Sequence, residues 1–383
     1  MWNGIRLVSD DSHFEGSPDQ WCDHVDASFR EWLPTVVELP GGGQGWQMPG
    51  KGKELPPIPL GLNVGAGRGW ENLKTNGISY PDEYNVGMGD AAQRLAEMDR
   101  DGIDAEVVYP PVSGKRALDG FIPGEAYIAI AEGYNNWLSE VYTAADPDRI
   151  LGLAILPHTT IDDAVAELRR VATLPGIRAI ALQSWPNGGG HPRPEDDKFW
   201  AAAEELGMPL TFHFSFGATA DERPAEFEGN WAPACTLLTR VDTNARTAFC
   251  CTQLIVNRVF DKFPSLRFSI AECGASWMPA YAMQADTNYT RHRHHAKIEL
   301  NHEPSWYIKR HFIFGMQDDD LAIRIRPEIG VEAMSWGTDF PHVATDYPHT
   351  LQLLDRMFDG VPEDDARKIL GGNLAAHLKL SPA

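Results

Sequence analysis

The first apolar run of the chain ends in residues that could bind a metal. Asp10, Asp11 and Glu15 flank His13 in the stretch IRLVSDDSHFEG. Asp11 and His13 are two positions apart, so on an extended segment their side chains point the same way. Imidazole and carboxylate ligands around one point suit zinc, manganese or iron. A divalent cation would also offset the negative charge that this stretch gathers around one imidazole.

Other candidate residues follow other short apolar runs. His213 follows MPLTF, Glu272 ends LRFSIAE, and Asp339 ends VEAMSWGTD, with His342 three positions later. Taken singly, each has a simpler explanation: a strand histidine is often only hydrogen-bonded in a core, and an aspartate in GTDFPH can simply make a turn. Their shared position at the ends of separate apolar runs favours one common site.

The elements that would position these residues alternate along the chain. Continuous apolar runs are expected of parallel strands that are covered on both faces. Eight such strand–helix units predict a (β/α)8 TIM barrel, in which the C-terminal ends of the strands carry the chemistry. A doubly wound open sheet is the main alternative, but the glycine-rich ligand loop expected after its first strand is lacking. The eight runs are residues 5–11, 103–110, 150–157, 177–183, 208–214, 266–272, 311–316 and 331–339.

Two stretches interrupt the alternation. Residues 33–90 are rich in glycine and proline, and residues 216–245 separate one predicted strand from its helix. We predict a single barrel domain over residues 1–383, distorted by a long insertion after its first strand. A loop as long as 33–90 is usually a lid or an interface arm. Its Trp46, Met48 and many prolines favour a packed arm, and homo-oligomerisation through this arm is a hypothesis.

Composition restricts the partners and the compartment. The formal net charge of -21 argues against binding to nucleic acid or to an anionic membrane. The sequence lacks the roughly 18 uninterrupted apolar residues of a membrane span, and its start lacks the pattern of a secretory signal. Five cysteines without a CxxC motif favour a reduced protein, so we expect a cytoplasmic location.

Several longer motifs run through nearly the whole chain: DSHFEGSPDQW, RLAEMDRDGIDAEVVYP, MPLTFH, FPSLRFSIAECGASWMP, WGTDFPH and KILGGNLAAHL. Together they resemble the amidohydrolase superfamily, in particular the amidohydrolase-related branch that includes aminocarboxymuconate-semialdehyde decarboxylase and γ-resorcylate decarboxylase. The resemblance implies a distorted (β/α)8 barrel with a divalent metal at the C-terminal ends of the strands. It also implies that the metal ligands are Asp11, His13, His213 and Asp339.

Some positions depart from the pattern of this branch. Asp11 stands where histidine or glutamate is usual, and Glu272 stands where the sixth strand often ends in histidine. The fourth strand ends at Gln183, so it offers no lysine to carry a bridging carbamate. Gly16 replaces a frequent glutamate three residues after the histidine of the first strand. We expect the neighbouring Glu15 to point elsewhere.

A histidine-rich stretch offers a possible second metal site. His292 and His295 are three positions apart in YTRHRHHAK, so on a helix they share a face. If that face turns toward the barrel mouth, Glu272 and one of these histidines could hold a second ion. The alternative is a solvated, charged helix end. One or two divalent ions, zinc, manganese or iron, are therefore the expected cofactors.

Three functions fit these residues. The first is a metal-dependent hydrolase or non-oxidative decarboxylase of a small carboxylate- or carbonyl-bearing molecule. In it, Asp339 would shuttle a proton, and Glu272 or His342 would orient the substrate or assist the transfer. The second is a dinuclear iron or iron–manganese oxygenase that hydroxylates a small organic substrate, which a carboxylate-rich site favours. The third is a non-catalytic partner subunit of an active homologue. The expected partners are therefore a small-molecule substrate and a second copy or a homologous subunit.

Overall fold

The structure is a computed structural model that describes residues 1–40, 42–54, 56–59, 64–67, 86–111, 122–213 and 231–381, with the backbone alone for residues 59 and 231–243. Eight strands form one parallel sheet in which each strand pairs with the next along the chain. They are β1 (Val8–Ser9), β5 (Ala105–Val108), β6 (Ile150–Ala154), β7 (Ile177–Leu182), β8 (Leu210–His213), β9 (Phe268–Ala271), β10 (Phe312–Met316) and β11 (Met334–Trp336).

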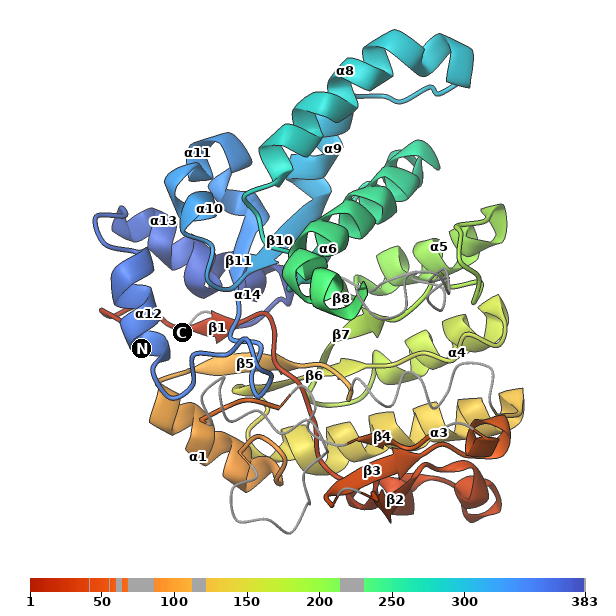
Figure 1. Ribbon diagram of the computed structural model, residues 1–383. Coiled ribbons are helices and arrows are strands. Elements are labelled where there is room, and N and C mark those ends of the chain that lie inside the picture. The colour runs from red at the N-terminus through yellow and green to blue at the C-terminus, as the bar shows by residue number, and fades with distance from the viewer. Residues whose placement is uncertain are drawn as a thin grey trace.

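The first and last strands of this sheet meet, so that the sheet curls into a barrel (Figure 1). The Asp10 amide donates to the Trp336 carbonyl at 3.0 Å, and Ser12 and Phe340 form a parallel bridge. The predicted (β/α)8 barrel is confirmed, and the open sheet is excluded. Each of the eight apolar runs predicted to be a strand contains one observed strand.

Helices cover the outside of the barrel, and several of their ends are capped by side chains or by glycine. The Asp90 side chain accepts from the Gln93 amide at the start of the first helix, which ends at Gly102 in the left-handed region (φ 79°). The Thr160 hydroxyl likewise accepts from the Asp163 amide. Such caps satisfy amides that a helix start leaves without partners.

The helices are α1 (Ala91–Asp101), α3 (Gly124–Trp137), α4 (Ile161–Val171), α5 (Asp197–Leu206), α6 (Trp231–Val256), α7 (Val259–Lys262), α8 (Met278–Ala296), α9 (Pro304–His311), α10 (Asp320–Arg324), α11 (Arg326–Ile329), α12 (Thr350–Met357), α13 (Glu363–Arg367) and α14 (Asn373–His377). Shorter 3-10 or π turns occupy Pro18–Gln20, Cys22–His24, Ala27–Trp32, Gly50–Glu54, Leu138–Tyr142, Thr143–Ala145, Pro194–Asp196, Val331–Ala333 and Lys368–Gly372.

Two sets of apolar side chains hold the barrel together. The larger cluster lies between the strands and the surrounding helices. A smaller one takes alternate residues of neighbouring strands, among them Val107, Leu151 and Leu153, as expected of side chains that point into a barrel. Leu374 of α14 and Leu378 belong to this inner cluster. The strand ends therefore rest on a packed interior rather than on an open channel.

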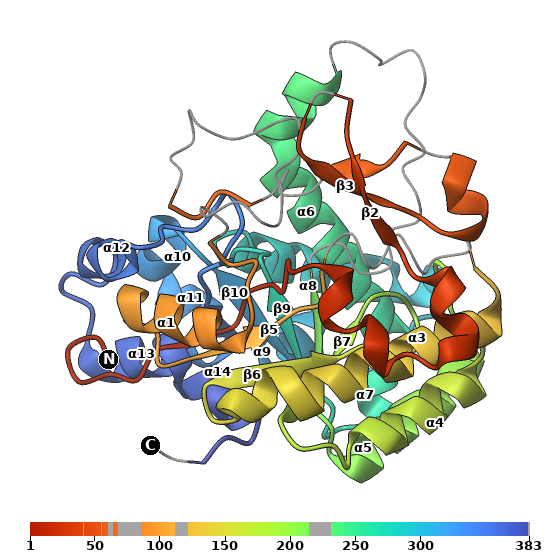
Figure 2. The same cartoon turned by 90° about the horizontal axis from the view of Figure 1, so that it is seen from below.

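The insertion after β1 contains a small antiparallel sheet, β2 (Thr35–Glu38), β3 (Gln44–Gln47) and β4 (Ile58–Pro59), seen beside the barrel in Figure 2. Trp46 and Met48 are buried against the core of the same chain, so the arm is packed as expected. Its role in oligomerisation stays a prediction. Residues 60–63 and 68–85 of this insertion, and residues 216–230 of the other, lie outside the described residues.

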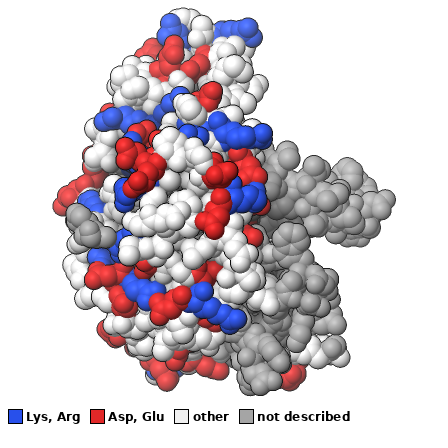
Figure 3. Space-filling model, turned by 90° about the vertical axis from the view of Figure 1, so that its left-hand side faces the viewer, with Lys and Arg blue, Asp and Glu red and all other residues white. Residues whose placement is uncertain are grey.

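The surface carries both signs of charge. On the face shown in Figure 3, acidic and basic side chains are interspersed rather than gathered into a single-sign patch. Within the part of the chain that the structure describes, no helix is both long enough and apolar enough to cross a membrane.

Candidate metal centre

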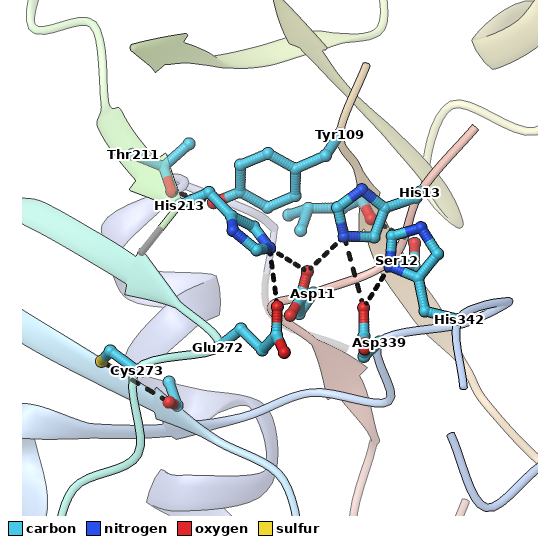
Figure 4. A network of polar contacts seen from close by, with 12 residues as sticks. Asp11, Ser12, His13, Tyr109, Thr211, His213, Glu272, Cys273, Asp339 and His342 are labelled. Carbon is cyan, nitrogen blue, oxygen red and sulfur yellow. Dashed lines mark hydrogen bonds and ion pairs between the residues drawn. The ribbon is translucent and has the colours of Figure 1, made fainter. Parts of the chain in front are cut away.

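The carboxyl ends of β1, β8, β9 and β11 bring five predicted residues around one point (Figure 4). His13 Nε2 lies 3.2 Å from Asp11 Oδ1 and 3.4 Å from Asp339 Oδ1. His213 Nε2 lies 3.7 Å from Asp11 Oδ1 and 3.4 Å from Glu272 Oε2. The site therefore contains two imidazoles and three carboxylates.

The local backbone explains how the two later carboxylates reach this point. Glu272 directly follows β9 and Asp339 follows β11 by three residues, and both adopt left-handed backbone angles, with φ of 54° and 52°. Few residues other than glycine adopt this conformation. It breaks the extended path at the strand end and turns each carboxylate toward the barrel mouth.

A fourth acidic side chain, that of Asp10, lies in the barrel wall one residue before Asp11. Asp10 is buried and accepts a hydrogen bond from the Ser335 hydroxyl. Burial raises the pKa of Asp10 to about 8, so this carboxyl is largely protonated at neutral pH. Glycines leave room for it, since a Cβ at either Gly315 or Gly337 would lie 2.4 Å from an Asp10 carboxylate oxygen.

The donor atoms around the centre fit a divalent cation. Two ligands that are each about 2.1 Å from a metal lie about 3.0 to 3.4 Å apart at octahedral or tetrahedral angles, close to the separations of 3.2 to 3.7 Å observed here. Both carboxylate oxygens of Asp11 and the Nε2 of His13 are buried, and among the described residues their close contacts are ion-pair distances to other site side chains, such as the 3.2 Å between His13 Nε2 and Asp11 Oδ1, rather than well-formed hydrogen bonds. Buried polar groups rarely lack hydrogen-bond partners, and a bound cation would provide a partner for these atoms.

Asp339 and His342 form a buried charged pair beside this centre. The His342 Nδ1 donates to Asp339 Oδ1 at 2.8 Å, and the His342 ring stacks on His13 with centroids 4.0 Å apart. Burial opposes ionisation of both groups, but the two charges more than offset it. The pKa of Asp339 is therefore held well below its ordinary value, and the pKa of His342 is raised. Both directions favour the charged forms of the two groups.

Glu15 points toward the site, so our expectation that it points elsewhere is wrong. Its Oε1 lies 3.2 Å from His342 Nε2, and His13, Glu15 and His342 form a second group of potential ligands. A Cβ at Gly16 would lie 2.5 Å from the Phe14 ring, so Gly16 cannot take the usual glutamate without movement of that ring. The sequence spacing could have predicted this position, because Glu15 follows His13 by two residues, just as His13 follows Asp11.

Tyr109 is a site residue that the sequence reasoning missed. It follows β5, and its ring centroid lies 5.6 Å from that of His13 and 5.4 Å from that of His213. Its hydroxyl group contacts the Thr211 hydroxyl. Burial and the nearby Asp11 raise its pKa, so the phenol stays neutral. The His13 and His213 rings also contact each other, with centroids 5.2 Å apart, so Tyr109 packs against a pair of touching imidazoles and contacts the strand that carries His213.

The structure does not bring His292 and His295 to Glu272. Both histidines are exposed, and α8 runs away from the barrel (Figure 1). His292 lies 14 residues after Met278, the first residue of α8, which places it about 21 Å along the helix axis. Within the described residues, Glu272 instead groups with Asp11 and Asp339. The stretch is therefore a solvated, charged helix end.

Comparison with known proteins places this chain in a family. The amidohydrolase family model matches residues 80–380. The chain is 24% identical over 306 residues to 2-amino-3-carboxymuconate-6-semialdehyde decarboxylase of Dictyostelium discoideum. The aligned region covers 78% of this chain and 79% of that protein.

Solved structures share the fold. The 5-carboxyvanillate decarboxylase of Sphingomonas paucimobilis matches with a TM-score of 0.69 and 19% identity, over 99% of this chain and 100% of that one. A dihydroxybenzoic acid decarboxylase of Polaromonas sp. JS666, solved with manganese and 2-nitroresorcinol, matches with a TM-score of 0.65 and 17% identity, over 99% and 98%. The resemblance drawn from the sequence motifs is confirmed, and the chain belongs to the amidohydrolase family.

Proposed function

We propose that this protein is a metal-dependent carboxy-lyase that removes CO2 from a small organic carboxylate without using oxygen. The observation that carries the proposal is the convergence of two imidazoles and three carboxylates at the barrel mouth, with separations that suit one divalent ion. The named activities of the similar proteins are decarboxylations, which favours a lyase over a hydrolase.

The residues that would hold the cation are Asp11, His13, His213 and Asp339, with Glu272 as a further carboxylate in reach. When bound, a divalent ion supplies a Lewis acid that polarises a carbonyl or carboxylate oxygen. Manganese is the first choice because the Polaromonas decarboxylase was solved with it. Zinc and iron are the alternatives, since the same ligand types bind them.

The chain's own residues can supply the proton that the reaction needs. Loss of CO2 leaves an electron pair on carbon, and that carbon must then be protonated. His342 donates through Nδ1 to Asp339, which faces the centre, and its Nε2 lies 3.2 Å from Glu15, which is partly exposed. We propose that Glu15, His342 and Asp339 form a proton path between the solvent and the substrate.

Anaerobic release of CO2 tests this proposal. Protein loaded with manganese, zinc or iron would be incubated without oxygen with the carboxylates named for the similar proteins, and the products identified by mass spectrometry. We expect CO2 together with a product that has exchanged its carboxyl group for hydrogen, and no reaction in metal-free protein. If a broad set of small carboxylates gives no CO2 with any of the three metals, the decarboxylase is refuted.

The carboxylate-rich centre also favours a second candidate, the dinuclear oxygenase. Asp11, Glu272 and Asp339 offer oxygen atoms within 4.8 Å of one another, and three like charges around one divalent ion repel unless one is protonated or a second cation is added. Two equivalents of iron per chain, lost in Glu272→Ala, together with oxygen-dependent hydroxylation would establish this candidate. About one equivalent and oxygen-independent turnover would exclude it.

We propose, finally, that the active form is a homo-oligomer or a complex with a homologous subunit. The centre itself is built from one chain, so a purely non-catalytic partner role is the weakest of the three functions. Mass in solution, measured with and without excess metal, tests the assembly. A single-chain mass under both conditions excludes the homo-oligomer.

A further inference from the structure

Arg94 of α1 lies behind the candidate metal centre with its side chain almost fully buried. Its Nη1 donates to the His13 carbonyl at 3.0 Å, and its Nε contacts the Glu106 carboxylate of β5. Its guanidinium carbon also lies 4.6 Å above the Phe340 ring. We propose that Arg94 is a positioning residue that fixes the spacing of His13 and Asp339. This role rests on the proposed metal-dependent function.

The contacts of Arg94 reach both ligand-bearing segments. The His13 amide donates to the Phe340 carbonyl at 2.7 Å, and the Asp339 amide donates to the Asp11 carbonyl at 2.9 Å. These two hydrogen bonds join the segment after β1 to the segment after β11. Thr338 adds another hydrogen bond, to the Asp11 carbonyl at 3.3 Å. Arg94 adds a further connection, from the His13 carbonyl to the ring next to Asp339. Because the two segments are joined, a displaced guanidinium would shift His13 and Asp339 together.

The chemistry of the contacts requires an arginine. A guanidinium presents several donors in a rigid plane, so Arg94 can reach Glu106 and the His13 carbonyl together while its flat face lies on Phe340. A lysine ammonium is a compact charge without such a plane. A contribution to stability alone does not explain why Arg94 and Glu106 are paired in the interior, because a buried ion pair is often no more stabilising than apolar residues of similar volume.

Arg326 of α11 is a control matched in its hydrogen bonds, with a side chain that is 18% exposed against 1% for Arg94. Its Nε donates to Asp365 of α13 at 2.7 Å, and its Nη1 donates to the Ile323 carbonyl at 2.9 Å. Arg326 thus makes the same two kinds of contact as Arg94, one to a carboxylate and one to a main-chain carbonyl. Its partners are not candidate metal ligands, so Arg326→Lys should disturb the fold locally and leave the metal centre intact.

The experiment compares Arg94→Lys with Arg326→Lys. The dissociation constant for Mn²⁺ is measured by calorimetry, the melting temperature is measured on metal-free protein, and the electron paramagnetic resonance spectrum of bound Mn²⁺ reports the ligand geometry. For Arg94→Lys we expect affinity weaker by about 10- to 100-fold, as found when groups that orient metal ligands are replaced, and a changed spectrum. Arg326→Lys should bind Mn²⁺ as the wild type does.

Each outcome decides the proposal. Wild-type affinity and an unchanged spectrum in folded Arg94→Lys would overturn it. If that variant does not fold, Phe340→Leu replaces it, because this change removes the ring under the guanidinium and keeps the Arg94–Glu106 pair. Weakened binding in Phe340→Leu then supports the role of Arg94, and unchanged binding refutes it. Absence of tight metal binding in the wild type would instead refute the metal centre and the proposed function.

Discussion

His377 links the stability of the barrel to pH. It is the last residue of α14, it is buried, and its Nε2 lies 3.0 Å from the Leu210 carbonyl of β8, the strand that ends with His213. Burial lowers the pKa of His377 from 6.5 to about 4, and the nearby Arg267 and Lys379 act in the same direction. The folded protein therefore holds this imidazole neutral.

The sign and size of the effect follow from these two values. In the unfolded chain the imidazole takes up a proton near pH 6.5, whereas in the folded chain it does so only near pH 4. Between about pH 6.5 and about pH 4 the unfolded state binds one more proton than the folded state. The contribution of neutral His377 to the free energy of unfolding is therefore fully present above about pH 6.5 and is lost as the pH falls to about 4. A pKa difference of about 2.5, at about 1.4 kcal/mol for each pKa unit, gives between about 3 and about 4 kcal/mol in full, of which about 3 kcal/mol is lost by about pH 4.

His377→Gln isolates this term. The glutamine amide nitrogen can donate from about the position of Nε2, and it does not titrate in this range. Denaturant unfolding of metal-free protein would be measured from about pH 7.5 to about pH 4. We expect the wild type to lose about 3 kcal/mol more than the variant over this range, since other acidic groups contribute equally to both. Parallel stability curves for the two proteins would refute the reasoning.

The remaining predictions concern the bound metal and Gly16, which lies three residues after His13. His13→Ala and His213→Ala should each lose bound metal, because too few ligands remain; full occupancy in both, by elemental analysis, would show that they are not ligands. Removing metal with a chelator should lower the melting temperature, and free metal at about 100 times its dissociation constant should restore about 2.7 kcal/mol; thermal scans that do not respond would contradict a centre formed in the folded state. Gly16→Ala should cost about 1–3 kcal/mol by overpacking, since its Cβ would lie 2.5 Å from the Phe14 ring; an unchanged denaturation midpoint would show that the ring moves without cost.

The sequence predicted the barrel because each strand is a short, continuous apolar run bounded by glycine, proline or charge. All eight runs contain a strand of the parallel sheet. The residues at or just after the ends of four of these strands lie together at one end of the barrel, as the geometry of parallel strands requires. Spacing along an extended segment was enough to place Asp11 and His13 together, and the same rule would have placed Glu15 beside His13.

The sequence could not give the direction of a helix after it leaves the barrel. The spacing of His292 and His295 showed only that they share a helix face, whereas α8 carries that face away from the mouth. The small sheet of the insertion was also missed, because β2, β3 and β4 lie in a glycine- and proline-rich stretch without a clear apolar pattern. Tyr109 was overlooked because an aromatic residue at a strand end is usually taken for packing.

The left-handed backbone at Glu272 and Asp339 has a consequence for how the centre is assembled. A residue with a Cβ in this conformation costs roughly 1–2 kcal/mol, and the fold bears that cost at both positions whether or not an ion is bound. The two carboxylates are thus preorganised, so cation binding does not have to order a loop that carries them. Asparagine tolerates left-handed angles as aspartate does, so Asp339→Asn would remove charge while keeping the main chain in place. The electrostatics of this centre can therefore be tuned separately from its architecture.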